Sequence, residues 1–461
     1  MFRTIPQRVS AYRSPRPLFL MFAAVPASAR SYGRWWRERL MTITKTPRNL
    51  ISSGKVSLVF TLAVFALLSG SVMLGQNYQI IHTFTGGGDG ATPDAGLTPD
   101  GHGNYYGTTY SGGAHNAGTA FRITPHGSGW VLSTLYSFTG GNDGGWPTTG
   151  LTFGPDGSLY GVNSGPAAYN LRPSATRPSN VLAEWTDRTL YQFQGIEDGF
   201  NPSGNLIFDH SGNIYGAMEI GGQGCYEGCG LIYELSPSGQ GWQKSVVYNF
   251  QGGLDGEAPL GIIFDHSGNL VGTTFEGGQY GLGAIFELTP SSSGWNETTL
   301  YSFANGSGGN QPAAGLVEDA VGNFYGGTLF GSGDGGVIFE LSPSNGGWVY
   351  TVLYNFPACG GFGTGPKAPL TLDAGGNLYG TFDGYYNSCP AGIFRLSPGQ
   401  GGWTYTSLHN FTGGSDGAHP YSTVSIDANG NLFGTASAGG EGCYGEGCGV
   451  VWEITPQLDW R

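Results

Sequence analysis

Seven near-copies of one segment follow one another along most of this chain of 461 residues. A copy has a strand ending in Phe, a Gly/Asp turn, a hairpin of the form Asp-x-x-Gly-Asn-aromatic-x-Gly, and, in most copies, a strand closing on Thr-Pro or Ser-Pro. A repeat of this length with strand signals alone predicts a β-propeller or a β-solenoid. The Phe recurs every 53 to 57 residues, at Phe84, Phe138, Phe193, Phe250, Phe303, Phe356 and Phe411.

The point within a copy at which the repeats begin and end distinguishes these two folds. The chain enters the first copy on the Phe-ended strand alone, Tyr78 to Phe84, and leaves the last copy after the Pro-ended strand, Val450 to Pro456. The last copy lacks a strand that the first residues supply, which is how a ring of blades closes without an open sheet edge. A solenoid would gain nothing from splitting a unit. We therefore predict an all-β, seven-bladed β-propeller over residues 76–461, closed by the N-terminal strand, with a β-solenoid as the alternative.

Each blade is expected to have four strands, which we name a to d from the channel outward. In the fourth copy these strands are predicted at residues 260–265, 269–274, 284–289 and 295–303. The Asp-x-x-Gly-Asn motif joins strands a and b. We interpret it as turn chemistry, because Asp accepts backbone N–H bonds where a turn begins and Gly supplies a positive φ.

Two dissimilar segments precede the repeats. Residues 1–40 are rich in Arg and carry a single acid. From Met41 a basic start and an apolar stretch at residues 56–68 are typical of a secretory signal peptide. We predict a signal peptide at residues 41–75, and an Arg-rich leader at residues 1–40 that translation from Met41 would omit. An uncleaved anchor over residues 56–74 is the alternative, since this largely apolar stretch of 19 residues is long enough to span a bilayer; cleavage leaves no stable membrane span.

Removal of this leader changes the charge of the chain. Eleven of the 19 basic residues lie within positions 1–55, which leaves 8 basic against 31 acidic residues and a net charge of −23. Such a surface disfavours nucleic acid as a partner. A polysaccharide or a protein remains a candidate partner, and we expect a monomer that is secreted, either extracellular or periplasmic.

The six cysteines fit an oxidising compartment and predict three disulfides. Two pairs each lie within one b-to-c loop, and the third joins a d-to-a loop to the next b-to-c loop, which an up-and-down blade places on the same face. The predicted bridges are Cys225–Cys229, Cys443–Cys448 and Cys359–Cys389.

The d-to-a loops read Gly-Gly-x-Asp-Gly-x-x-Pro in most copies. A Gly-rich turn closed by Pro explains this pattern. The functional interpretation is a ring of carboxylates around one mouth of the channel, able to attract a cationic ligand or Ca²⁺. We expect no cofactor, with calcium at this ring as the alternative. The acidic residues are Asp89, Asp143, Asp198, Asp255 and Asp416.

Aromatic side chains accompany these acids. They either fill gaps between Gly-rich loops or stack on sugar rings beside the carboxylates. The candidates are Trp146, which follows a d-to-a turn, and Tyr226, Tyr280, Tyr385 and Tyr444 in the b-to-c loops. The eight His are scattered, and no spacing matches a catalytic triad or a metal site, so we assign no catalytic residue.

The repeat resembles the GloVer tandem-repeat family of exported bacterial proteins. Its motif, Leu-Tyr-x-Phe-x-Gly-Gly-x-Asp-Gly-x-x-Pro followed by Gly-Asn-Leu-Tyr-Gly-Thr-Thr and Phe-Glu-Leu-Thr-Pro, is clearest at residues 133–161, 246–290 and 408–435. The resemblance implies export and propeller-like β repeats, and it carries no established activity and no catalytic residue.

These observations favour a binding or interaction scaffold whose ligand, a carbohydrate or a protein, sits on the acidic, aromatic loop face. Two alternatives stay open. One is a lyase or glycosidase that uses carboxylates at the channel mouth, an analogy that rests on fold alone. The other is a purely structural cell-surface protein.

Overall fold

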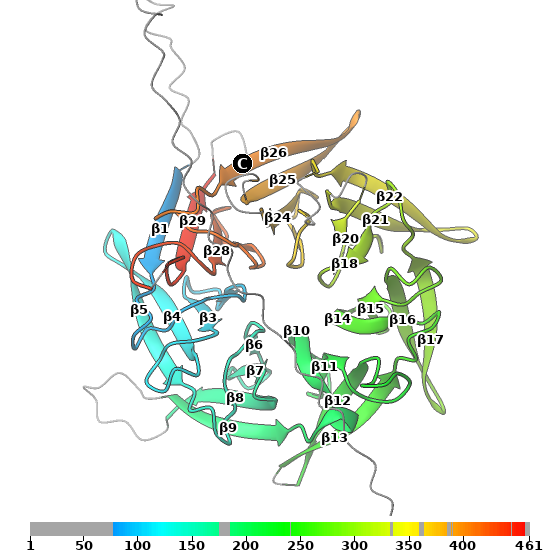
Figure 1. The fold of residues 1–461 in the computed structure, drawn as a ribbon, viewed down its shortest axis with the longest axis horizontal. Coiled ribbons are helices and arrows are strands. Elements are labelled where there is room, and N and C mark those ends of the chain that lie inside the picture. Colours follow the sequence, from blue (N-terminus) through cyan, green and yellow to red (C-terminus); the bar gives the residue numbers. More distant parts are fainter. Residues whose placement is uncertain are drawn as a thin grey trace, which may run out of the picture. The chain divides into compact units, whose positions relative to one another are not determined.

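In the computed structural model, the copies fold into seven antiparallel sheets arranged as a ring (Figure 1). The structure describes residues 77–174, 185–239, 241–331, 335–358, 364–384, 389, 391–443 and 445–456. All of them belong to one compact unit, residues 74–461. The predicted leader and signal peptide lie outside the described residues and stay predictions.

Each blade is a meander of four strands, and the predicted seven-bladed propeller is confirmed. The innermost strands, a, are β2 (Thr98–Pro99), β6 (Thr152–Phe153), β10 (Phe200–Phe208), β14 (Glu257–Phe264), β18 (Asn310–Pro312) with β19 (Val317–Glu318), β23 (Thr371–Leu372) and β27 (Ser425–Ile426). Strands b are β3 (Tyr105–Thr109), β7 (Leu159–Asn163), β11 (Ile214–Ile220), β15 (Leu270–Glu276), β20 (Phe324–Phe330), β24 (Leu378–Phe382) and β28 (Leu432–Ala436). Strands c are β4 (Thr119–His126), β8 (Ala167–Pro173), β12 (Leu231–Ser238), β16 (Ala284–Ser291), β21 (Val337–Ser344), β25 (Gly392–Gly399) and β29 (Val450–Thr455). The outermost strands, d, are β5 (Gly129–Ser137), β9 (Trp185–Gln192), β13 (Gly241–Asn249), β17 (Gly294–Ser302), β22 (Gly347–Asn355), β26 (Gly402–Asn410) and β1 (Asn77–Thr83).

Burial along the strands follows from this arrangement. Strand b of the fourth blade, β15, is buried over its first five residues, because neighbouring blades cover both faces of the sheet. Strand d, β17, alternates between exposed and partly buried residues over its first six positions and has no fully buried residue, since it forms the outer edge. The hydrophobic core therefore lies between blades. One cluster joins Tyr215 of the third blade to Phe286 of the fourth, and Trp295 packs edge-on against Tyr215 at 6.3 Å between ring centroids.

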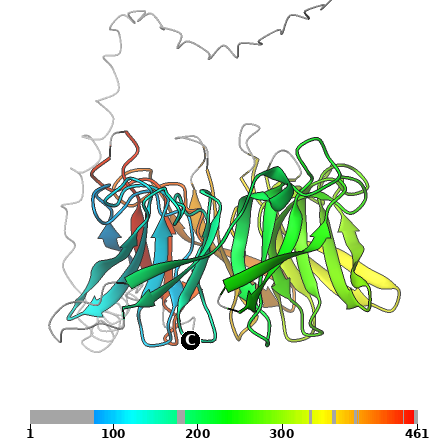
Figure 2. The same ribbon diagram turned by 90° about the horizontal axis from the view of Figure 1, so that it is seen from below.

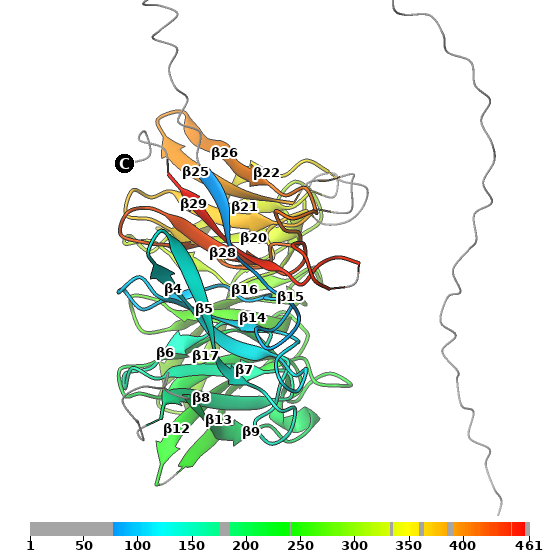
Figure 3. The same cartoon turned by 90° about the vertical axis from the view of Figure 1, so that its left-hand side faces the viewer.

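The ring closes as the repeat phase predicts. β1 pairs with β29 in antiparallel register from Asn77 opposite Thr455 to Thr83 opposite Val450, and Figure 3 shows the two strands side by side. The amide Nε2 of Gln79 donates to Glu453 at 2.6 Å. The first strand thus completes the seventh blade and removes a sheet edge.

The interpretation of Asp-x-x-Gly-Asn as turn chemistry is also confirmed. In the fourth blade Oδ1 of Asp265 accepts from the backbone N–H groups of Ser267 and Asn269 at 2.8 and 2.7 Å. Gly268 between them has a φ of 84°. The carboxylate therefore holds the turn that joins strands a and b.

Two of the three predicted disulfides are confirmed, Cys225–Cys229 and Cys443–Cys448, with Cα atoms 5.2 and 5.0 Å apart. The third involves Cys359, which lies outside the described residues, so that pairing stays a prediction. A 3₁₀ turn, η1 (Ile196–Asp198), is the only helical element in the part of the chain that the structure describes. That part contains no helix long and apolar enough to cross a membrane.

Candidate functional site

The d-to-a and b-to-c connections lie on one face of the ring, which we call the loop face. Figure 2 shows it along the upper edge, where the red connection from β28 to β29 rises. The a-to-b and c-to-d turns lie on the opposite face. The central channel runs between the faces as a space of about 630 Å³ lined by residues of all seven blades.

The residue that follows the repeated Pro of the d-to-a loop lines this channel in every blade. Four blades place a small or apolar side chain there, so a charge is not required for the propeller to form. Blades one, six and seven instead have a charged or a large polar side chain at this position. The seven residues are Asp94, Thr148, Ser203, Leu260, Ala313, Lys367 and Tyr421.

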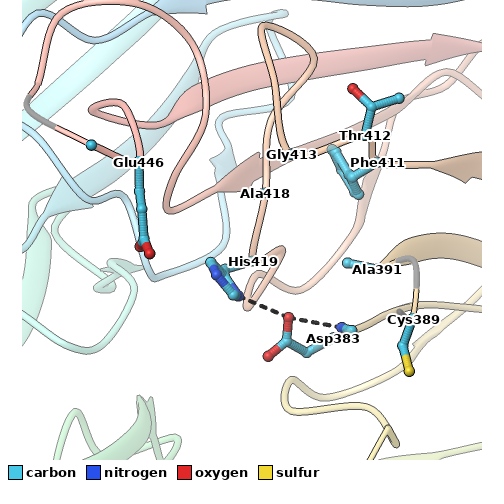
Figure 4. A pocket seen from close by; sticks show the side chains of 11 residues that line it. Asp383, Cys389, Ala391, Phe411, Thr412, Gly413, Ala418, His419 and Glu446 are labelled. Atoms are coloured by element: carbon cyan, nitrogen blue, oxygen red, sulfur yellow. Dashed lines mark hydrogen bonds and ion pairs between the residues drawn. The ribbon is translucent and has the colours of Figure 1, made fainter. Parts of the chain in front are cut away.

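Asp383, which follows strand b of blade six, connects the departures of blades six and seven into a network at the channel mouth, and Asp94 of blade one acts electrostatically on Tyr421 and His419 of this network. Its Oδ2 accepts from Lys367 Nζ at 2.9 Å and from the hydroxyl of Tyr421 at 3.0 Å. Its Oδ1 lies 3.0 Å from Nδ1 of His419 (Figure 4). We call Asp94, Lys367, Asp383, His419 and Tyr421 the mouth cluster.

The charges of the mouth cluster stabilise one another. Burial alone would raise the pKa of Asp383, but the hydrogen bond from His419 and the positive charge of Lys367 outweigh it and hold that pKa below its ordinary value. The same hydrogen bond raises the pKa of His419 above its ordinary value, although burial opposes it. Lys367 also lies over the ring of Tyr421, with Nζ 4.6 Å from the centroid. Asp383 therefore lies between the ammonium group of Lys367 and the imidazole of His419.

Two further carboxyl groups line the channel. Burial raises the pKa of Asp94 to about 6. Burial also raises the pKa of Glu219, whose carboxylate accepts from Asn201 at 2.6 Å. Perturbed carboxyl groups that face a cavity are typical of functional sites.

A hollow of about 400 Å³ lies beside the cluster on the loop face. Asp383, His419 and Glu446 line it together with Phe411 and Thr412 (Figure 4). Both this hollow and the channel fall within the range of roughly 300–1,000 Å³ that small-molecule sites occupy.

Exposed aromatic side chains gather on the same face, over blades one to four. Tyr226 is 100% exposed, Tyr280 55%, Phe200 47%, Tyr110 39% and Trp146 38%. Each lies in a d-to-a or b-to-c connection or at the strand end beside one. Among the residues described, these are all of the exposed aromatic side chains. The loop face thus combines aromatic surface on one part with an ionic cluster on another.

The five predicted aspartates are engaged in their own turns. Asp143 accepts from the backbone of Thr139 at 2.8 Å and from Tyr136 at 2.9 Å, and Asp198 is bound by Lys244 at 2.6 Å. Asp89, Asp255 and Asp416 likewise accept a backbone N–H from the residue four positions before them. Hydrogen bonds lower the pKa of Asp143, Asp198 and Asp416 against the effect of burial.

Calcium binding by these aspartates stays a prediction. The structure places them in five separate loops. Within the described ranges, the only three metal-ligand side chains with donor atoms within 4.8 Å of one another are Cys225, Cys229 and Glu257, and both cysteines are in a disulfide. Melting curves with calcium and with EDTA test the prediction.

The other predicted site residues divide into two groups. Trp146, Tyr226 and Tyr280 are exposed on the loop face, whereas Tyr385 and Tyr444 lie outside the described residues. Sequence reasoning missed Asp94, Lys367, Asp383 and His419. Comparing the copies position by position after the repeated Pro would have found Asp94 and Lys367, because only departures from the repeat carry charge there.

Comparison with known proteins identifies the family of the repeat. A family model described as the Gloeobacter/Verrucomicrobia repeat matches residues 64–226, 180–328 and 277–459. An ulvan lyase is similar in structure, with a TM-score of 0.46, 11% identity, and coverage of 82% of this chain and 95% of that one. A carbohydrate-active enzyme from Trichoderma reesei (TM-score 0.40, 15% identity, 83% and 96% coverage) and a gluconolactonase from Xanthomonas campestris (0.36, 11%, 82% and 99%) are similar to a lower degree. None of the curated proteins matches. At this identity the structural likeness concerns the fold alone.

Proposed function

The chain belongs to the Gloeobacter/Verrucomicrobia repeat family, and on that premise we propose that its propeller binds a carbohydrate across the loop face. The ligand spans the exposed aromatic side chains and the mouth of the central channel. The observation that carries this proposal is the gathering of every exposed aromatic side chain of the described residues on the face where the channel positions depart from the repeat.

The aromatic side chains supply the apolar part of such a site. Large exposed rings are costly to leave in water, and grouped on one face they mark an interaction surface. The apolar faces of sugar rings pack against aromatic rings, while the hydroxyl of a tyrosine stays available for hydrogen bonds. Trp146 and Phe200, on adjacent blades, would support successive sugar units.

The mouth cluster supplies the polar part. Carboxylates accept hydrogen bonds from sugar hydroxyls, and Lys367 and His419 donate them. The net charge of −23 outside positions 1–55 favours a neutral ligand over a polyanion. Neutral glycans therefore fit this surface better than sulfated or uronate-rich ones.

The site is proposed to work outside the cytoplasm. The two observed disulfides support this location, because such bonds persist in oxidising compartments. A secreted protein, whether extracellular or periplasmic, would be surrounded by polysaccharides.

Retention on immobilised glycans tests the proposal. We expect the purified protein to be retained by at least one of cellulose, laminarin, xylan, mannan and dextran. Trp146→Ala and Phe200→Ala should each weaken binding about tenfold, equivalent to about 1.4 kcal/mol. Because Trp146 and Phe200 are 38% and 47% exposed, truncation removes only part of their packing, so the melting temperature should fall only slightly.

Val349→Ala is the control, because Val349 is also an exposed apolar side chain, at 51%, but lies on the outer strand β22. Its affinity should equal that of the parent. If none of the five glycans retains the protein, the proposal is contradicted. A protein ligand or a purely structural role would then be the better explanation.

A further inference from the structure

We propose that the mouth cluster hydrolyses a glycosidic bond of the bound carbohydrate, with His419 as the proton donor to the leaving oxygen and Asp94 as the base that activates water. This inference rests on the proposed carbohydrate binding. It assigns chemistry to residues that the repeat itself does not need.

The hydrogen bond to Asp383 prepares His419 for this role. Because an ionised carboxylate only accepts, the proton of this bond belongs to Nδ1 of the imidazole. Nε2 is therefore the nitrogen left for a ligand, and the imidazole lies between Asp383 and Glu446 at the edge of the hollow (Figure 4). The negative charge of Asp383 favours the imidazolium form, in which Nε2 also carries a proton.

Asp383 acts as a positioning residue. Both of its oxygens are occupied, Oδ1 by His419 and by its neighbour Gly384, whose N–H lies 2.9 Å away, and Oδ2 by Lys367 and Tyr421. A carboxylate bound in this way cannot reach a substrate as a nucleophile. It can hold the imidazole in one tautomer and one orientation, as the third group does in catalytic triads.

Asp94 is placed to act as the base. It lines the channel at the position that follows Pro93. Ser437 lies beside its carboxyl group and donates its hydroxyl to the backbone carbonyl of His419 at 3.1 Å, so Ser437 connects Asp94 to the backbone of the residue that carries the imidazole. The positive charge of His419 also acts on the carboxyl group of Asp94. With a pKa of about 6, Asp94 is ionised at neutral pH yet remains a better base than an ordinary aspartate.

The proposed step balances with water as the only co-reactant. The bond between the anomeric carbon and the glycosidic oxygen breaks, its electron pair stays on that oxygen, and the oxygen takes the proton from Nε2. The water oxygen bonds to the anomeric carbon and loses a proton to Asp94. A proton then returns from Asp94 to His419 through solvent. No metal or redox partner takes part.

The pH dependence follows from the two groups. Asp94 must be ionised, which requires a pH above about 6. His419 must be protonated, which requires a pH below its raised pKa, itself above 6.5. Asp383 and Glu446 are the charged groups that face the imidazole and raise its pKa, while Lys367 lowers it. We expect a bell-shaped profile with its maximum between these limits.

Release of reducing ends from hexasaccharides of the retained glycan tests the inference. His419→Gln and Asp94→Asn should each lower kcat at least about 100-fold while retention on the glycan stays within about threefold of the parent. Asp383→Asn should move the alkaline limb of the pH profile to lower pH, because the imidazolium loses its partner. A role in stability alone would not move that limb. Glu441→Gln, an exposed acid in the loop before β29, is the control and should leave kcat unchanged.

Each outcome decides between the two proposals. Retention without any product overturns the hydrolysis and leaves the binding proposal intact. Product formation that survives both His419→Gln and Asp94→Asn, or an unsaturated product formed by elimination, also overturns it. A protein that no glycan retains contradicts the proposed function itself, and the hydrolysis with it.

Discussion

A variant that lacks residues 77–83 will lose its cooperative thermal transition and aggregate. Without β1, strand β29 presents an unpaired and apolar edge, which is a template for association with other chains. Tyr78 stacks on His409 at 3.6 Å between ring centroids and packs with Ile80 against the core of blade seven. Tyr78, Ile80 and Ile81 are partly buried, so each contributes part of the roughly 1.5–3 kcal/mol that full burial of such a side chain gives. Together with the lost pairing of β29, this is a substantial share of the roughly 5–15 kcal/mol that stabilises a typical domain.

Size-exclusion chromatography and scanning calorimetry measure this effect. The matched control moves the deleted strand behind β29, joined by residues 291–294, the hairpin turn that links β16 to β17. This permuted chain has the same strands in the same ring, so we expect it to be monomeric and to melt near the parent. A deletion variant as stable and monomeric as the parent would contradict ring closure.

Gly272→Ala will destabilise the propeller through a clash inside one blade. Gly272 on β15 faces Phe286 on β16 across the sheet, and a Cβ at this position would lie 2.7 Å from Cζ of the phenyl ring. Phe286 is fully buried, so the ring has no free space to enter. Overpacking of this kind costs typically 1–3 kcal/mol. The other blades repeat the pair as Gly107 with Phe121, Gly161 with Tyr169, Gly216 with Tyr233, Gly326 with Phe339, Gly380 with Phe394 and Gly434 with Trp452.

Urea unfolding of three variants separates the clash from the loss of glycine flexibility. Gly346→Ala adds the same methyl group where nothing lies within 4 Å, and its stability should stay within about 0.5 kcal/mol of the parent. Adding Phe286→Leu to Gly272→Ala should recover part of the lost stability, since the shorter side chain makes room. Equal stabilities of Gly272→Ala and Gly346→Ala would refute the clash.

The fold could be predicted from the sequence because its determinants are local and repeated seven times. Asp265 and Gly268 form their turn from contacts within five residues. The repeat occurs in six further copies, so a deviation in one copy does not hide the pattern. The last copy lacks one strand and the first residues of the repeat region supply it, which indicated that the ring of blades closes. Both inferences needed only the order of strands and the chemistry of turns, which a single sequence displays.

The candidate site could be predicted only in part, for the opposite reason. Asp143 and Asp255 recur at the same position of their copies. A residue that recurs in most blades has a structural role within each blade. Asp383 and His419 occur once each, on different blades, and nothing local links them. Their hydrogen bond exists because the ring places the end of β24 beside the loop that precedes β27. A site built between repeats is visible only when the ring has been assembled.

The most direct test of the account is the structure of the protein with a retained oligosaccharide bound. We predict sugar units on the loop face, from the rings of Trp146 and Phe200 to the channel mouth, with a hydroxyl or glycosidic oxygen within hydrogen-bonding distance of His419 Nε2. An oligosaccharide bound on the opposite face, among the a-to-b turns, would contradict it.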